Sequence, residues 1–235
     1  MKKLVYLFAF LFSAWAMASE HVALDHAPID PNNQASLQRG AKYFVNYCLN
    51  CHSAASMRYN RLMDIGLSEA QIKNNLLFAS EKVGDTMTVA MQKADAKVWF
   101  GAAPPDLSVE ARARGADWLY TYLRGFYRDS SRPTGWNNVA FDKVAMPHVL
   151  WQLQGQQVLQ TDPQHHSQRL VLDKPGSLSP AQYDLMVADI VNYLVYMSEP
   201  YKQQDKRLGL LVLGFLAVLL VLTYLLKKEF WKDLD

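Results

Sequence analysis

The segment Cys48-Leu49-Asn50-Cys51-His52 holds both cysteines of this sequence, three residues apart, with a histidine directly after the second. Two thiols at this spacing near the end of a helix can add to the two vinyl groups of one protoporphyrin. The histidine then lies under the iron as an axial imidazole. The spacing therefore predicts one covalent haem c, with Cys48 and Cys51 as its attachment points and His52 as a metal ligand.

Other uses of a cysteine pair suit this sequence less well. A thioredoxin-like redox dithiol needs a βαβ context, whereas the residues around the motif have helical spacing. A zinc site needs further cysteines or an ordered histidine pair nearby. Because the chain has two cysteines in all, a disulfide scaffold and a four-cysteine cluster are excluded. An accidental pair of cysteines is the remaining alternative.

Met146 is the candidate for the sixth position on the iron, because Pro147 follows it. A residue before proline is pushed toward extended geometry, which lets a loop hold a thioether sulfur against a metal. Such a ligand raises the reduction potential and closes the iron to oxygen, which favours electron transfer over catalysis. A core methionine before a turn is the alternative reading of Met146. The other candidate ligands are His26, His148, His165, His166, Met57, Met63, Met87, Met91, Met186 and Met197.

The N-terminus has the pattern of a secretory signal peptide. Lys2 and Lys3 precede an apolar run over residues 4–14, and small residues follow at Ala16 and Ala18. This order predicts a signal peptide over residues 1–18 that is cleaved after Ala18. An uncleaved N-terminal anchor is the alternative, but the apolar run is short for a membrane span.

A second apolar stretch, residues 208–226, contains no charged side chain. As a helix it extends about 28 Å, which is enough to cross the core of a bilayer. A buried core helix is seldom apolar on every face, so a membrane span is favoured. With an exported N-terminus, the sequence predicts an exported domain over residues 19–205, a transmembrane anchor over 206–227 and a cytoplasmic tail over 228–235.

The composition and net charge exclude some classes of protein but do not identify a binding partner. Half of the 235 residues are hydrophobic and 20% are charged, which excludes a disordered chain. The 24 basic and 22 acidic residues leave a net charge of +2, which gives no indication of nucleic-acid binding.

Helical spacing dominates the exported part, so we expect a mainly α fold with loop insertions. Gly40 lies on the apolar face of the first helix, where another helix can approach closely. The last helix begins with a capping box of Ser179 and Gln182 around Pro180 and ends before Pro200. The predicted helices cover residues 36–48 with Ser36 as N-cap, 68–77 with a capping box of Ser68 and Gln71, 117–127, and 180–199.

Two segments rich in proline and glycine, residues 102–108 and 130–147, are predicted as loops. Val158-Leu159 and Leu170-Val171-Leu172 can pair as a hairpin across a glutamine-rich stretch.

Several segments, taken in order, resemble the cytochrome c1 family, the haem-bearing subunit of quinol–cytochrome c oxidoreductase (the cytochrome bc1 complex). The resemblance covers most of the chain after the signal peptide. The haem motif is shared by many cytochromes, whereas the Pro-Pro-Asp-Leu-Ser and Ala-Met-Pro segments followed by a C-terminal anchor are far more specific. The matching segments are residues 48–53, 57–59, 81–87, 101–108, 145–147, 189–194 and 199–200.

The resemblance assigns roles to further residues. It implies that Met146 is the sixth iron ligand and that Arg114 helps to hold a haem propionate, although Arg112 is equally close in sequence. Pro105, with its neighbour Pro104, corresponds to packing at the haem edge. Trp118 stands where many members of the family have a propionate-binding tyrosine. In a second departure, Trp99-Phe100 stands where other members have an asparagine.

The resemblance also implies a function. A cytochrome c-type haem domain with a single C-terminal transmembrane helix would accept one electron from the Rieske iron–sulfur protein and pass it to a cytochrome c. Its other partners would be cytochrome b and the lipid bilayer, in a dimeric complex of the bacterial inner membrane with the haem domain in the periplasm. Such a subunit has no active site of its own.

The sequence leaves three alternative functions open. One is a membrane-anchored monohaem cytochrome c that serves a terminal oxidase or a dehydrogenase. Another is a haem enzyme or gas sensor with an open iron position. The third is an anchor protein with an accidental motif.

Overall fold

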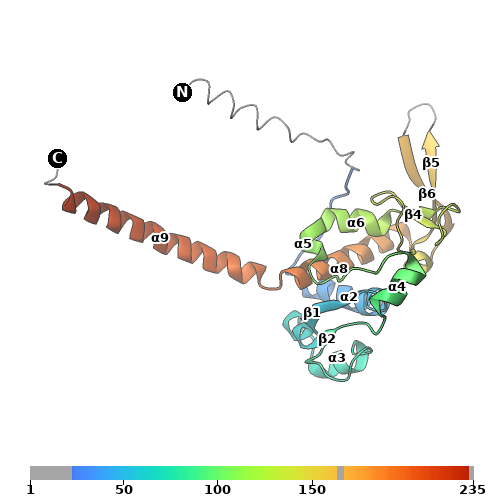
Figure 1. Ribbon diagram of the computed structural model, residues 1–235, viewed down its shortest axis with the longest axis horizontal. Coiled ribbons are helices and arrows are strands. Elements are labelled where there is room, and N and C mark those ends of the chain that lie inside the picture. The colour runs from blue at the N-terminus through green and yellow to red at the C-terminus, as the bar shows by residue number, and fades with distance from the viewer. Residues whose placement is uncertain (1–22, 163–166, 233–235) are drawn as a thin grey trace.

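Helix α8 (Pro180–Ser198) is the central helix of the folded body in the computed structural model, which describes residues 23–162 and 167–232. Its predicted capping box is confirmed: the Ser179 side chain accepts from the Gln182 amide, and the Gln182 side chain accepts from the Ser179 amide. Met186 and Met197, two of the other candidate ligands, are buried in the main core. Figure 1 shows α8 between α6 (Ala116–Arg124) and α2 (Gln34–Tyr43). The predicted signal peptide, residues 1–18, lies outside the described residues.

Helix α2 crosses α8 at Gly40, as the sequence predicts. A Cβ atom at Gly40 would lie 2.1 Å from the Asp189 carbonyl oxygen, so the two backbones are in direct contact there. The Arg39 guanidinium adds a two-pronged ion pair to the Asp189 carboxylate, at 2.6 and 2.8 Å. The predicted N-cap was wrong, because Asn33 and not Ser36 caps α2, and its side chain accepts from the Ser36 amide at 3.0 Å.

The predicted helix over residues 36–48 changes its hydrogen bonding half-way. After α2 the chain continues as a π-helix, η1 (Phe44–Cys48), in which the Leu49 amide donates to the Phe44 carbonyl at 3.0 Å. Short π-helical segments are frequent at functional sites. This one delivers Cys48 to the side of α2 that faces the core.

Shorter helices surround this pair. The Ser68–Gln71 capping box is confirmed, and the third predicted helix ends early because the chain turns into a strand after Gly125. The remaining helices are a 3₁₀ helix η2 (Tyr59–Ile65), α3 (Glu69–Asn75), α4 (Lys93–Phe100), α5 (Glu110–Arg114) and α7 (Trp151–Gln154).

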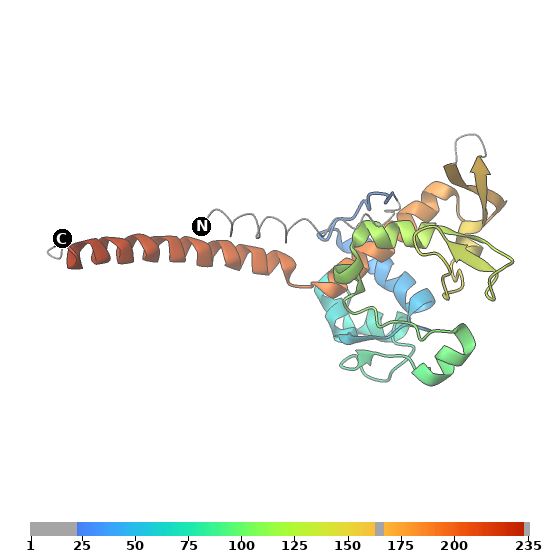
Figure 2. The ribbon, with the colours of Figure 1, turned by 45° about the horizontal axis from the view of Figure 1, so that its top comes forward.

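Within residues 23–162 and 167–232, the strands form three antiparallel pairs. The predicted hairpin is confirmed, with Val158 opposite Val171 and Leu159 opposite Leu170, and Figure 2 shows it projecting from the body. A short strand at Trp136–Asn138 lies within the segment predicted as loop. The pairs are β1 (Ala54–Arg58) with β2 (Thr86–Met87), β3 (Phe126–Arg128) with β4 (Trp136–Asn138), and β5 (Gly155–Asp162) with β6 (Ser167–Pro175).

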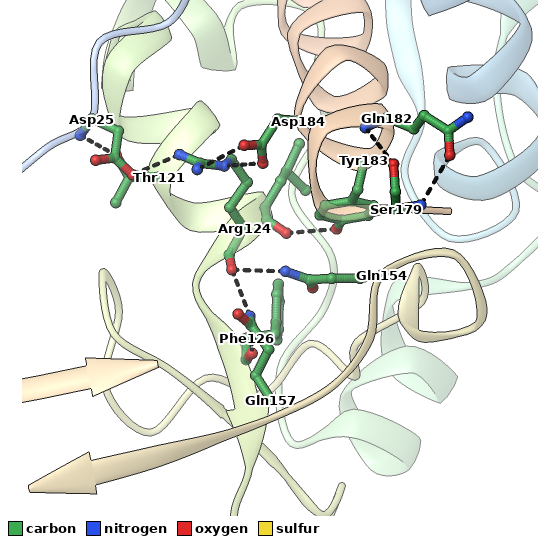
Figure 3. Close-up of polar contacts among 11 residues, drawn as sticks. Asp25, Thr121, Arg124, Phe126, Gln154, Gln157, Ser179, Gln182, Tyr183 and Asp184 are labelled. Atoms are coloured by element: carbon green, nitrogen blue, oxygen red, sulfur yellow. Dashed lines mark hydrogen bonds and ion pairs between the residues drawn. The ribbon is translucent and has the colours of Figure 1, made fainter. Parts of the chain in front are cut away.

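Arg124 joins four parts of the body at the end of α6 (Figure 3). Its guanidinium pairs with Asp184 of α8 at 2.6 Å and with Asp25 of the N-terminal segment at 2.6 Å. Its carbonyl accepts from the side chains of Gln154 and Gln157, at 3.0 and 2.9 Å. These contacts fix the point at which α6 turns into β3.

Helix α9 (Lys202–Phe230) extends away from the body in both ribbon views. Residues 205–230 have a mean hydropathy of 2.7 in their most apolar window, and none of that window is buried. By length and composition this helix can cross a membrane. The mainly α fold with one C-terminal apolar helix is therefore confirmed.

Candidate haem site

The motif folds back on itself directly after η1. The amides of Cys51 and His52 both donate to the Cys48 carbonyl, at 3.0 and 2.9 Å. This tight turn places the two thiols and the imidazole on one short stretch of chain.

The His52 imidazole is oriented by the Pro-Pro-Asp-Leu-Ser segment. Its Nδ1 lies 2.8 Å from the Pro105 carbonyl oxygen. Because a carbonyl can only accept, Nδ1 carries the proton and the lone pair of Nε2 is free for a metal. Burial lowers the pKa of His52 below its usual value, although the hydrogen bond to Pro105 works in the opposite direction. The ring is therefore held in the neutral form that ligates metals.

Hydrogen bonds fasten the segment that carries Pro105 to the chain just after the motif. The Leu107 amide donates to the Ser53 carbonyl at 2.8 Å. The Asp106 carboxylate accepts from the Ala55 amide at 2.8 Å, and the Ser108 hydroxyl accepts from the Ser56 amide at 3.0 Å. The orientation of His52 thus depends on a segment more than fifty residues further along the chain.

Met146 lies in a small hydrophobic cluster of its own. Phe126, Trp136 and Val144 form the buried part of this cluster, and Tyr122 and Met146 pack against it. The Tyr122 hydroxyl donates to the Met146 sulfur at 3.4 Å. The loop that carries the sulfur is therefore held by this cluster and by Tyr122, which also packs against the main core.

One cavity of about 340 Å³ brings all the predicted site residues together. The motif and Met146 both line it, and the remaining lining side chains are mostly apolar. A haem needs two thiols at one edge, an axial donor on each face and an apolar surround, so the residues present fit this group. The predicted residues that line the cavity are Cys48, Cys51, His52, Pro105, Arg114, Trp118 and Met146.

The structure distinguishes Arg114 from Arg112, the two candidates for contact with a haem propionate. Arg114 lines the cavity, where its guanidinium lies 4.8 Å from the Trp118 ring centre and 3.1 Å from a Glu110 carboxylate oxygen. Arg112 is absent from the cavity lining and lies 3.9 Å from Glu199. Arg114 is thus the arginine placed to meet a carboxylate inside the cavity.

Comparison with known proteins agrees with this geometry. Residues 25–234 match the model of the cytochrome c1 family. The chain belongs to the cytochrome c1 family. It is the haem-bearing electron-transfer subunit of a cytochrome bc1 complex.

Three curated relatives match this chain over most of their length. The chain is 49% identical to cytochrome c1 of Allochromatium vinosum, over 99% of both chains. It is 32% identical to cytochrome c1 of Rhodospirillum rubrum, over 86% of this chain and 82% of that one. A protein of Nitrosomonas europaea named ammonia monooxygenase gamma subunit is 56% identical, over 92% of this chain and 91% of the relative.

The two cysteines do not have the environment of a redox dithiol. Burial, with a smaller contribution from Cys51, raises the pKa of Cys48 to about 12, and burial also raises the pKa of Cys51. Catalytic dithiols need a lowered thiol pKa, since the thiolate is the nucleophile. The pair is therefore suited to structural attachment and not to thiol exchange.

None of the other candidate ligands that the structure describes lines the cavity. His148 is buried outside the cavity lining and stacks on Phe126, with ring centres 4.8 Å apart. The His26 side chain is 90% exposed. Met57 and Met87 are buried in the main core, and Met63 is exposed. His165 and His166 lie outside the described residues.

The cavity lining also contains residues that the sequence did not single out, among them Tyr122, Glu110 and Phe141. The sequence did contain a signal for Tyr122, which follows Trp118 by one helical turn on the same face of α6. In the structure, both side chains on this face line the cavity.

Proposed function

We propose that this chain carries a single haem c, attached covalently through Cys48 and Cys51, with His52 and Met146 as the axial ligands. The observation that carries the proposal is the cavity that joins the motif to Met146. The free Nε2 of His52, fixed by the hydrogen bond of Nδ1 to Pro105, supports it as well. Arg114 is proposed to meet a haem propionate, with Pro105 and Trp118 packing at the haem edge.

When bound, the haem supplies a one-electron ferric–ferrous couple. His52 and Met146 would hold the iron, apolar side chains would exclude water, and ligand type and burial would set the reduction potential. Because two protein ligands leave no position for a substrate, the proposed role is electron transfer alone.

We further propose that the electron comes from the Rieske iron–sulfur protein and goes to a cytochrome c, while cytochrome b oxidises quinol in the same dimeric complex. Membership of the cytochrome c1 family supports these partners. The proposed placement is the bacterial inner membrane, with residues 19–205 in the periplasm after removal of the signal peptide. The exposed apolar side chains of α9 over residues 208–226 support an anchor in lipid.

Purification of the complex from membranes in mild detergent tests the partnership. Copurification with cytochrome b and a Rieske protein is the expected result. Copurification with an oxidase or dehydrogenase core would overturn it. Association with a monooxygenase would also overturn it, and this outcome matters because the Nitrosomonas europaea relative is named ammonia monooxygenase gamma subunit. Haem that stays with the chain after denaturation is expected, and free thiols at full occupancy in a mass spectrum would refute the covalent attachment.

Met146→Leu tests the sixth ligand with little change in volume. We expect carbon monoxide to bind the ferrous variant rapidly and the reduction potential to fall, because the thioether has been removed. Met63→Leu is the matched control, since Met63 is exposed and absent from the cavity lining. An unchanged low-spin spectrum and potential in Met146→Leu would reject Met146 as a ligand.

A further inference from the structure

A stack of aromatic rings on α6 fixes the position of Tyr122 in the cavity wall. The Tyr122 ring lies parallel to Trp118, with ring centres 4.9 Å apart and an angle of 13° between the planes. On its other side it meets Phe126 edge-on, at 5.2 Å and 70°. Because Trp118 and Phe126 both contact the ring of Tyr122, this ring has little freedom to rotate, and the direction of its hydroxyl is fixed.

The Tyr122 hydroxyl needs a partner, because a buried hydroxyl without a hydrogen bond is costly. Within residues 23–162 and 167–232, the acceptor that it has is the Met146 sulfur, at 3.4 Å. A thioether is a weak acceptor in water. In an apolar cavity, where water does not compete, the same contact is stronger.

The stack also reaches the far side of the methionine loop. Phe126 stacks on His148 at 4.8 Å and 4°, and Trp136 meets His148 edge-on at 5.0 Å. His148 follows Met146 by two residues. Ring packing therefore holds the loop at His148, and the Tyr122 hydroxyl holds it at the Met146 sulfur. The distance between the Tyr122 hydroxyl and the Met146 sulfur is therefore fixed by the ring contacts of Tyr122 and by those of His148.

We infer that Tyr122 is a positioning residue whose hydroxyl donates a hydrogen bond to the Met146 sulfur and thereby raises the reduction potential of the bound haem. This inference rests on the proposed function, in which Met146 is an axial ligand. A thioether sulfur has two lone pairs, so one can bind a metal while the other accepts a hydrogen bond. The hydrogen bond withdraws electron density from sulfur, which weakens its donation to the ferric ion and favours the ferrous form.

Tyr122→Phe removes the hydroxyl and keeps the ring stack. We expect the equilibrium constant for electron uptake to fall between threefold and tenfold, where tenfold corresponds to 59 mV. We also expect a shift in the ferric methionine-to-iron charge-transfer band. Tyr120→Phe is the matched control on the same helix, because Tyr120 is buried but absent from the cavity lining. Its potential and spectrum should equal those of the parent protein.

A potential and charge-transfer band in Tyr122→Phe equal to those of the parent would overturn the inference. Met146→Leu distinguishes this failure from a failure of the proposed function. If Met146→Leu alters the spectrum while Tyr122→Phe does not, the ligand is correct and the hydrogen bond has no effect. If neither variant differs from the parent, Met146 is not a ligand.

Replacement of Tyr122 by 3-fluorotyrosine gives a second test that keeps the ring and the hydroxyl. The fluorine makes the hydroxyl a stronger donor, so the potential should rise, opposite to the change in Tyr122→Phe. A fall in potential, or no change, in the fluorinated protein would contradict the inference even where Tyr122→Phe does not fold.

Discussion

Asp106 connects the two segments that hold the proposed haem ligand His52. One carboxylate oxygen accepts from the Ala55 amide and the other accepts from the Ser108 amide, both at 2.8 Å. Burial alone would raise the pKa of Asp106, but the hydrogen bonds from Ser108 and Ala55 outweigh it and lower the pKa below its usual value. The ionised carboxylate is thus part of the folded structure, although the residue itself is exposed.

Asp106→Asn should therefore destabilise the protein in a pH-dependent way. A carboxyl group whose pKa is lowered by folding stabilises the fold fully above its unfolded pKa of about 3.9 and loses this contribution as the pH falls through the folded value. We expect a loss of about 1 kcal/mol at pH 7. The difference from the parent should shrink as the pH falls below about 4.

Thermal unfolding followed by circular dichroism between pH 7 and pH 2 measures this difference. Asp173→Asn is the control, since Asp173 is an exposed carboxylate with no hydrogen bond in the described structure. A difference between Asp106→Asn and the parent that stays constant across this range would show that the charge of Asp106 has no part in the effect.

At the scale of the elements, the crossing of α2 on α8 leaves no room for a side chain at Gly40. A Cβ atom there would meet backbone at 2.1 Å and the Tyr193 Cβ at 2.7 Å, neither of which can rotate away. Gly40→Ala should therefore force the helices apart and cost about 1–3 kcal/mol. Because η1 continues α2, the same displacement should weaken the low-spin haem spectrum.

The thermal midpoint and the haem spectrum of Gly40→Ala test this expectation. Gly84→Ala is the matched control, because a Cβ atom at Gly84 has nothing within 4 Å. We expect the control to stay within about 0.5 kcal/mol of the parent. Equal stability of Gly40→Ala and Gly84→Ala would show that the α2–α8 crossing can relax without loss.

Elements with local signals were predictable from the sequence, and elements that depend on distant contacts were not. The capping boxes at Ser68 and Ser179 lie within four residues, so they mark α3 and α8 directly. Strand β1 pairs with β2, which is about thirty residues away in sequence, and no local pattern predicts that pairing. The change to a π-helix at Phe44 leaves the apolar spacing intact, so the sequence indicated an ordinary helix there.

The same distinction holds for the site. Cys48, Cys51 and His52 form a motif within five residues, so their chemistry can be inferred without a fold. The choice of Arg114 over Arg112 depends on which side of α5 faces the cavity. The hydrogen bond from His52 to Pro105 joins residues 53 positions apart and requires the folded structure.

At the scale of the whole molecule, described contacts join the body to the residue that precedes α9. The Arg61 guanidinium donates to the Tyr201 hydroxyl at 2.6 Å and lies 4.6 Å from the centre of its ring. The Tyr196 hydroxyl donates to the Arg61 carbonyl at 3.1 Å. The buried core of the body contains no described residue after Met197, so the body does not depend on α9 for its packing.

A chain that ends at Tyr201 should therefore fold without its anchor. Such a chain keeps Arg61, its contact with Tyr201 and every cavity residue, because the cavity lining ends at Leu194. We expect it in the soluble periplasmic fraction with covalent haem and the spectrum and potential of the full-length protein, which itself stays in the membrane fraction. Its mass should correspond to a chain that starts at Ser19. A truncated product that is insoluble or lacks haem would mean that α9 contributes to folding of the body, contrary to the exposed helix in the structure.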